Sequence, residues 1–481
     1  MTMTESPRYS FSILPSRTIM WGMSWEKLAP LAGSMLFVGF ATTKLHIPLV
    51  VALIPAAVVT LSCFITVKER KMIEYIRVAF GFLLEPRAWV SPLPMARLGS
   101  RSARPDTLRL PPELSGLAFS EITVSGTTVG AIEMGRGKSK SVVCVLEISS
   151  VSPFLLLTPG EQGQLLAKWG LVLDQSATEE MRVRNLEWIV RITPAGGNEA
   201  QEWADQHMTM ETPPHIAADY HALLGSLTQA ASGREYYLVV EIATGTKKRG
   251  LDIVSLEIAA LIRRLKEAEL VGRVLDLSEV TRLMRAMLVG DPINAVDPLS
   301  PHEVAPKARE VAWDYMRVDD SYIRSCCVHN WPAEEVGPAW LQGLLAINGS
   351  RAAITIAVHL RPTRPSQSRQ RVRAAITTTE AAVEYRRRGG FASSAQANRE
   401  QQEAKEREEQ LVSGYKEHRI GCVLTVTASS LEELEEEYDH LVHSAESTGI
   451  RVRKLYLEQK QGLAASLPLG RLSFTGGLGG W

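Results

Sequence analysis

The chain has 481 residues, 45% of them hydrophobic and 22% charged, and its 53 basic residues balance 53 acidic ones. This composition excludes a disordered acidic or basic chain. Residues 1–110 hold 13 basic and 6 acidic side chains, which leaves residues 111–481 with a net charge of −7 and argues against direct nucleic-acid binding. Five scattered cysteines are too few for a disulfide framework and indicate a reduced, cytoplasmic domain.

Two apolar segments near the N-terminus predict a transmembrane helical hairpin. Residues 47–67 form 21 residues without a charge, which as a helix would cross a hydrocarbon core of about 30 Å. Residues 28–43 are shorter and would span only if flanking lysines and interfacial anchors at Trp21 and Trp25 extend them. A secretory signal peptide is the alternative, although the first run lacks a clear cleavage site and a second run follows at once.

Basic residues that flank the hairpin predict its orientation. Lys68, Arg70, Lys71 and Arg77 follow the second segment, whereas the short connection holds one lysine. The positive-inside rule then places both termini in the cytoplasm of a multi-pass cell-membrane protein. The same cluster either seats the domain on anionic lipid or serves only as a topology signal.

Alternating strand-like and helix-like runs follow a proline-rich linker and predict an α+β fold of two ferredoxin-like or related halves. The predicted strands are Glu121–Val124, Thr128–Met134, Ser141–Ile148, Asn185–Ile192, Glu235–Ile242, Tyr322–His329, Ala352–Leu360, Ile420–Thr427 and Arg451–Leu455. The predicted helices are Gly160–Trp169, Asn198–Met208, Ile253–Glu269, Ala339–Ala346, a helix after Pro365, the charged helix Ala395–Leu411, and Ser430–Ser447.

The predicted domain organisation follows from these elements. The regions are a cytoplasmic segment 1–27, a hairpin 28–67, a basic segment with the linker 68–115, a first half 116–312, a second half 313–470 that includes the charged helix 395–411, and a glycine-rich tail 471–481. A helix that is polar on all sides either projects into solvent or meets a partner.

Short motifs do not specify an active site. Lys138 and Ser139 follow a glycine as in a phosphate-binding loop, but Ile132 stands where that loop needs a glycine, and a strand-like run follows, so a hairpin turn is predicted. Glu436, His440 and His443 share one helix face, yet that face is opposite the apolar one and would be solvated.

A second histidine group, at His215, Asp219 and His221, is weaker because the two histidines point in different directions on a helix. No zinc, nucleophile or dinucleotide motif is complete. We therefore expect no metal site, no cofactor and no enzymatic activity.

The order of parts resembles a known family. A two-helix hairpin and a basic segment precede a mixed domain that ends in Arg451–Tyr456 and Gln461–Gly470. This is similar to the PrgI-like integral membrane proteins of actinobacterial conjugation clusters, whose hairpin looks like the small two-helix subunit of type IV secretion systems. The soluble region resembles the non-catalytic amino-terminal region of the secretion ATPase, and Leu173-Asp174 before Trp188 and the run His359–Pro362 fit the same pattern.

The resemblance implies a structural role. The printed sequence ends eleven residues after Gly470, where the ATPase motor would begin, so docking carries over and hydrolysis does not. The expected function is a membrane-anchored docking subunit of a conjugative DNA-transfer apparatus, which holds a separate secretion ATPase and contacts the bilayer, other conjugation subunits or further copies of itself. The alternatives are a type VII secretion membrane component and a membrane-tethered enzyme that uses Lys138 and Ser139 or the His440 face.

Overall fold

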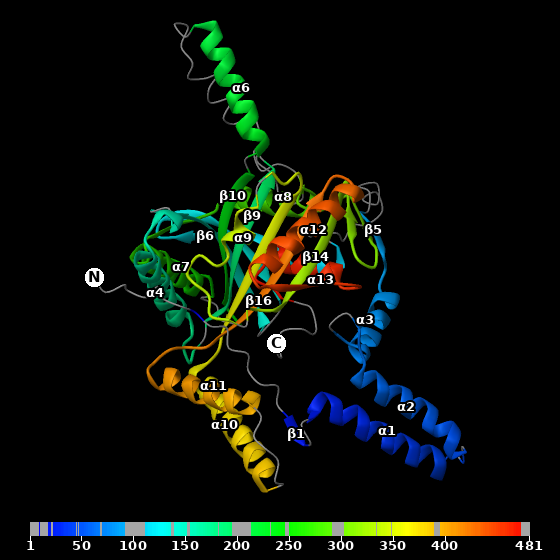
Figure 1. Cartoon of the computed structure of the whole chain (residues 1–481). Coiled ribbons are helices and arrows are strands. Elements are labelled where there is room, and N and C mark those ends of the chain that lie inside the picture. The colour runs from blue at the N-terminus through cyan, green and yellow to red at the C-terminus, as the bar shows by residue number, and fades with distance from the viewer. Residues whose placement is uncertain are drawn as a thin grey trace.

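The computed structural model (Figure 1) describes most of the folded part of the chain. The described residues are 9, 18–20, 23–44, 46, 48–67, 70–91, 111–135, 139–151, 154–180, 182–194, 213–230, 232–245, 250–290, 303–332, 334–347, 349–388 and 395–472. The helix expected at Asn198–Met208, residues 92–110 of the predicted linker and residues 473–481 of the predicted tail lie outside them.

One antiparallel sheet organises the chain, and in the described residues it has thirteen strands. Its order is β5-β12-β13-β14-β16-β15-β9-β10-β8-β7-β6, and β11 and β17 pair additionally with β8 and β14. The strands are β5 (Ala88–Val90), β6 (Ala118–Val124), β7 (Thr127–Met134), β8 (Ser141–Ser150), β9 (Val183–Pro194), β10 (Ser232–Ala243), β11 (Leu270–Val274), β12 (Ala308–Val311), β13 (Met316–Val318), β14 (Ser321–Asn330), β15 (Ala353–Pro362), β16 (His418–Ala428) and β17 (Arg451–Lys454). Every predicted strand overlaps one of these.

The two predicted halves are edge-joined parts of this single sheet. In the first half the strand order is β11-β8-β10-β9, and in the second it is β17-β14-β16-β15, so both have the same β-α-β-β-α-β arrangement as ferredoxin-like folds. Strands β9 and β15 pair antiparallel at the seam, where Ile189 lies opposite Ala357. One core cluster therefore contains buried residues of both halves, Ile189 and Ala357 among them.

Helices cover both faces of the sheet. Because both sides of the central strands are therefore buried, their sequences are nearly continuous apolar runs. On one face α4 and α7 pack on the first half, and α9 and α12 pack on the second. On the other face α8, α13 and the chain after α13 share one core. These helices are α4 (Pro159–Ser176), α7 (Gly250–Glu267), α8 (Leu277–Val289), α9 (Gln342–Leu345), α12 (Leu431–Ser447) and α13 (Gln459–Ser466).

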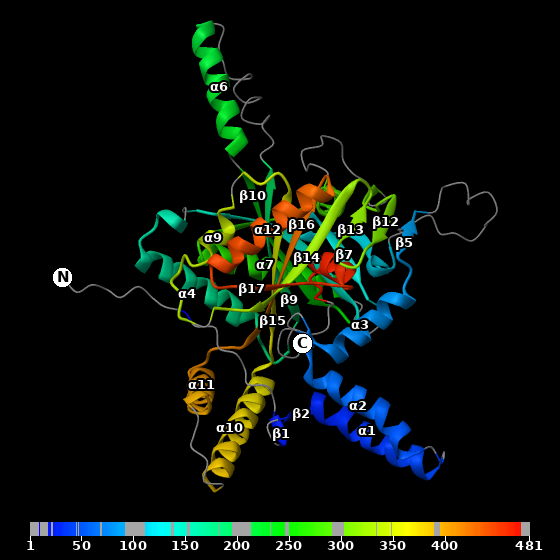
Figure 2. The same cartoon turned by 45° about the vertical axis from the view of Figure 1, so that its right-hand side comes forward.

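Two helical arms leave opposite ends of the sheet (Figures 1 and 2). Helix α6 (Pro214–Ala230) lies in the connection between β9 and β10, and α10 (Pro365–Arg388) with α11 (Ala395–Val412) lies in the connection between β15 and β16. Both connections join the second and third strands of their half. Because β9 and β15 run antiparallel, the arms point in opposite directions.

The predicted transmembrane hairpin is wrong, because none of the helices in the described residues is long and apolar enough to cross a membrane. Helix α2 (Leu49–Phe64) has 16 residues, or about 24 Å, because Pro48 precedes it and Thr66–Val67 pair with Arg70–Lys71 as strands β3 and β4. Helix α1 (Trp25–Thr43) has 19 residues but includes Glu26 and Lys27 in its first turn.

The expectations that depended on the hairpin are corrected with it. These are the membrane-spanning part of the fold, the transmembrane assignment of residues 28–67, and the multi-pass location with both termini cytoplasmic. The two helices instead pack on each other, with a contact of 3.3 Å between the hydroxyls of Ser34 and Thr60, and α3 (Met72–Leu84) follows them. Strands β1 (Thr18–Met20) and β2 (Met23–Ser24) form a small separate pair.

The residues assigned to the membrane surface are placed only in part. Trp21 and Lys68 lie outside the described residues. Trp25 begins α1, Arg70 and Lys71 form β4, and Arg77 lies in α3. For these four residues the structure describes the backbone element but not the side chain.

Candidate functional site

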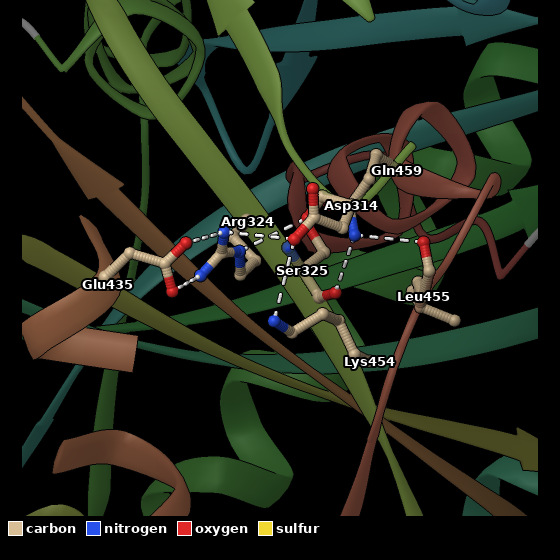
Figure 3. Close-up of polar contacts among 7 residues, drawn as sticks. All are labelled: Asp314, Arg324, Ser325, Glu435, Lys454, Leu455 and Gln459. Carbon is tan, nitrogen blue, oxygen red and sulfur yellow. Dashed lines mark hydrogen bonds and ion pairs between the residues drawn. The ribbon is translucent and has the colours of Figure 1, made fainter. Parts of the chain in front are cut away.

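The first polar cluster surrounds a buried arginine on strand β14 (Figure 3). Arg324, whose side chain is 1% exposed, donates to both carboxylate oxygens of Glu435 on α12 at 2.7 Å. It also donates to the carboxylate of Asp314 at 3.2 Å. These paired contacts raise the pKa of Arg324 against the opposing effect of its burial, and the hydrogen bonds from Arg324 lower the pKa of Glu435.

Aromatic rings connect this charge cluster with the surface. The Arg324 guanidinium lies 5.2 Å from the ring centroid of Tyr438, and the Lys454 ammonium lies 4.6 Å from the same ring and 5.7 Å from Tyr456. Tyr456 packs on Trp313 with ring centroids 4.8 Å apart, and Trp313 is exposed. Stacked cations and aromatic rings of this kind stabilise one fixed arrangement of side chains.

Gln459 joins helix α13 to the other face of β14 (Figure 3). Its Oε1 accepts from the backbone nitrogen of Ser325 at 2.8 Å, and its Nε2 donates to the carbonyls of Ser325 and Leu455 at 3.2 and 2.9 Å. Gly462 follows one turn later, where a Cβ would lie 2.5 Å from the Cβ of Ser325. The amide and the glycine together place α13 in close contact with the sheet.

The second polar cluster lies beneath residues 467–470, which we call the C-terminal strap. His359 on β15 contacts the carbonyl of Ala465 at 2.7 Å and the amide nitrogen of Asn185 at 3.1 Å. Asn185 also donates to the carbonyl of Gly470 at 3.0 Å, and the Gly470 nitrogen donates to Glu187 at 2.8 Å. The strap is therefore attached to the seam between β9 and β15 by side chains from both strands.

His359 and Glu187 are both completely buried, and their environment favours the neutral forms. Burial lowers the pKa of His359 to about 4 and raises the pKa of Glu187 well above its ordinary value. Burial thus disfavours the charged form of each group at the contact of 3.7 Å between His359 Nε2 and Glu187 Oε1. The cluster holds the strap by hydrogen bonds among buried groups.

The buried cysteines do not provide a nucleophile. Burial raises the pKa of both Cys144 and Cys422 to about 12, and it also raises the pKa of Cys326. Because the thiolate is the reactive form, these thiols are inert at neutral pH.

The motifs considered from the sequence are not brought together. Lys138 lies outside the described residues, and β7 and β8 pair antiparallel on either side of it, so a strand rather than a helix follows Ser139. His440 and His443 are exposed on α12, and Glu436 instead pairs with Arg351. In the described part of the chain, no three His, Cys, Asp or Glu side chains are grouped as a metal site requires.

The group at His215, Asp219 and His221 lies on the α6 arm, away from both polar clusters (Figure 1). The runs His359–Pro362, Arg451–Tyr456 and Gln461–Gly470 were noted from the sequence only for their family resemblance, and Arg324, Asn185 and Glu187 were not singled out. A usable signal was present, because Arg324, Glu187 and His359 each lie beside apolar residues within a predicted strand. Buried polar side chains need partners, which in a folded domain come from distant segments.

Comparison of the sequence with protein-family models and with curated proteins finds no match.

Proposed function

We propose that this chain is a docking subunit without enzymatic activity that holds a separate secretion ATPase in a conjugative, type IV secretion-like DNA-transfer apparatus. The observation that carries docking is the pair of helical arms at opposite ends of one continuous sheet. Because the arms extend away from the sheet, they add accessible surface and not hydrophobic core, and accessible surface can contact partners. The ATPase and the conjugative setting come from the sequence resemblance at Arg451–Tyr456 and Gln461–Gly470.

The interior of the sheet supports a scaffolding role. Its buried ionisable groups include neutral thiols, a neutral histidine and the ion pair of Arg324 with Glu435, and the partners of these groups are other parts of the same chain. Groups arranged in this way hold elements in place. By fixing the sheet, these groups fix the strand ends from which the two arms extend.

The charged arm α10–α11 is our proposed contact for the ATPase. Helix α11 carries five glutamates and three basic residues, and its Glu406, Glu408 and Glu409 side chains are exposed. Charged helix surfaces give orientation and partner selection to an interface.

The test is affinity purification of the tagged full chain from its native cell, followed by mass spectrometry. The arm variant is Glu406→Lys with Glu409→Lys, and the matched control with the same change of charge is Asp439→Lys with Glu446→Lys on exposed positions of α12. We expect the secretion ATPase to copurify in stoichiometric amount with the wild type and the control, and at least tenfold less with the arm variant. Recovery of the chain without the ATPase, or equal recovery with the arm variant, would contradict the proposal.

A further inference from the structure

The α1–α2 hairpin has its small side chains inside and its large apolar side chains outside. Where its side chains are described, the buried ones are all alanine or serine: Ser34, Ala41, Ala52, Ala56 and Ser62. Small side chains allow two helices to approach each other closely, but they bury little apolar area. The contact between α1 and α2 therefore leaves most of the apolar side chains of the hairpin uncovered.

The large side chains form an outer surface on the hairpin. Among its described residues, eleven large apolar side chains have exposed fractions between 46% and 75%, and the most exposed on each helix are Leu36 at 75% and Val50 at 71%. At about 100 Å² for each half-exposed side chain, this surface amounts to about 1,000 Å². The largest apolar patch on a typical monomer is smaller, about 300–600 Å², and larger patches mark interaction sites.

The position and the charge of this surface restrict what can cover it. Figures 1 and 2 show that α1 and α2 project away from the sheet, so the body of the chain leaves the outer surface open. Residues 28–43 and 47–67 contain no charged side chain. Burying a charge without a partner is costly, so a matching partner presents an apolar, uncharged surface of similar size.

A second copy of the chain meets both conditions. In a two-fold symmetric dimer each copy contributes the same patch, so the areas and the absence of charge match by construction. The interfaces of homodimers are more apolar than other interfaces, and a stable interface buries about 800 Å² on each partner. The outer surface of the hairpin is large enough to supply that area. The net charge of zero adds no overall repulsion between two copies.

We propose that the chain is a homodimer in which the α1–α2 hairpins of two copies pack on each other through their outer surfaces. Leu36 and Val50 lie in this interface, and the two hairpins together form a four-helix arrangement with large apolar side chains at its centre. The proposal concerns self-association alone and does not depend on the secretion ATPase.

The test is sedimentation equilibrium of the full chain, purified without detergent, over a range of concentrations. The hairpin variant is Leu36→Glu with Val50→Glu, and the matched control is Leu171→Glu with Leu256→Glu at exposed positions of α4 and α7. We expect the wild type and the control to have twice the mass of one chain. The hairpin variant should associate at least tenfold more weakly, because its dimer buries carboxylates without partners.

Three results would overturn the proposal. The first is a wild type with the mass of one chain at every concentration, and the second is a hairpin variant that dimerises as tightly as the control. The third is a single chain that binds phosphatidylcholine vesicles and loses this binding in the hairpin variant alone, which would assign the surface to lipid. Circular dichroism shows whether each variant is folded. If the hairpin variant is not, Leu36→Ala with Val50→Ala takes its place and should also weaken the dimer.

Discussion

The two hairpins that carry the arms have the same place in their halves but opposite charge chemistry. On the first, Arg191 of β9 lies directly opposite Glu235 of β10, and the two form an ion pair of 3.1 Å. On the second, Arg361 lies opposite Arg419. The first cross-strand pair attracts and the second repels, which teaches that the second hairpin depends on other groups around its two arginines.

The halves also differ in how they hold the helix that follows their last strand. Helix α8 packs on the first half through an apolar face that includes Leu283, Met284 and Met287. Helix α13 packs on the second half through Gln459 and the close approach at Gly462. Apolar packing tolerates small shifts, whereas hydrogen bonds specify one register.

The largest effect should come from the apolar core of the first half. Leu265→Ala removes a completely buried side chain of α7 and should lower the free energy of unfolding by about 2–5 kcal/mol. Leu256→Ala, at an exposed position of the same helix, should change it by less than about 0.5 kcal/mol. Urea unfolding followed by tryptophan fluorescence measures both, and similar values for the two variants would refute the assignment of this core.

The buried arginine of the second half should matter nearly as much. Arg324→Ala leaves Asp314 and Glu435 without their partner and should cost about 3 kcal/mol, near the low end for a buried pair because Glu435 is half exposed. Arg373→Ala, at an exposed position of α10, is the control and should change stability by less than about 0.5 kcal/mol. If Arg324→Ala unfolds at the same urea concentration as the control, the charge cluster does not stabilise this half.

The seam between the halves should make stability depend on pH. His359 has a pKa of about 4 in the folded chain and about 6.5 when unfolded, so between these values the unfolded chain binds a proton that the folded chain does not. Stability should therefore fall as the pH falls from 6.5 to 4, by about 3 kcal/mol from this residue.

Urea unfolding at several pH values, compared between the wild type and His359→Gln, isolates this contribution. Glu187, whose pKa is raised, acts in the opposite sense above pH 4.5 and is present in both proteins. The exposed His443→Gln variant should follow the wild type. A pH profile of His359→Gln that runs parallel to the wild type would show that His359 does not titrate in this way.

Two helical glycines allow the effect of close packing to be compared with the effect of helix propensity. Gly462→Ala forces α13 away from Ser325 and Leu455 and should destabilise the chain by about 1–3 kcal/mol. Gly170→Ala in α4, where a Cβ meets nothing within 4 Å, should stabilise it by up to about 1 kcal/mol. Thermal unfolding of both variants measures the difference, and a neutral Gly462→Ala would mean that α13 is not tightly packed.

The smallest effect tests the hairpin comparison directly. Arg361→Thr removes one side of the like-charge pair at an exposed position and should change stability by less than about 1 kcal/mol. Arg191→Thr takes a buried arginine from Glu235 and should destabilise the chain by more. Urea unfolding measures both changes, and equal destabilisation by the two variants would remove the distinction between the two hairpins.

The strands could be predicted from the sequence because each long one is an apolar, β-branched run, such as Val142–Leu146 in β8. Helix α12 could also be predicted, since Leu434, Tyr438 and Leu441 recur at helical spacing and are buried. The length of α2 could not, because apolar composition does not show that the chain turns into a short strand pair at Thr66.

The polar clusters depend on pairing that spacing along the chain does not contain. Arg324 meets Glu435, and His359 meets Asn185, only after the sheet has set the register of strands more than 100 residues apart. The opposed arginines at 361 and 419 likewise follow from the β15–β16 register alone. A sequence shows that such residues need partners but not which partners they find.

The seam between β9 and β15 has a mechanical consequence. The arms leave from the far ends of these two antiparallel strands, so a pull that separates the arms draws one strand past the other along their length. Hydrogen bonds between antiparallel strands lie perpendicular to that direction and bear the load together rather than one after another. The seam should therefore resist a force applied along the two arms far better than a force that peels the sheet open from β6.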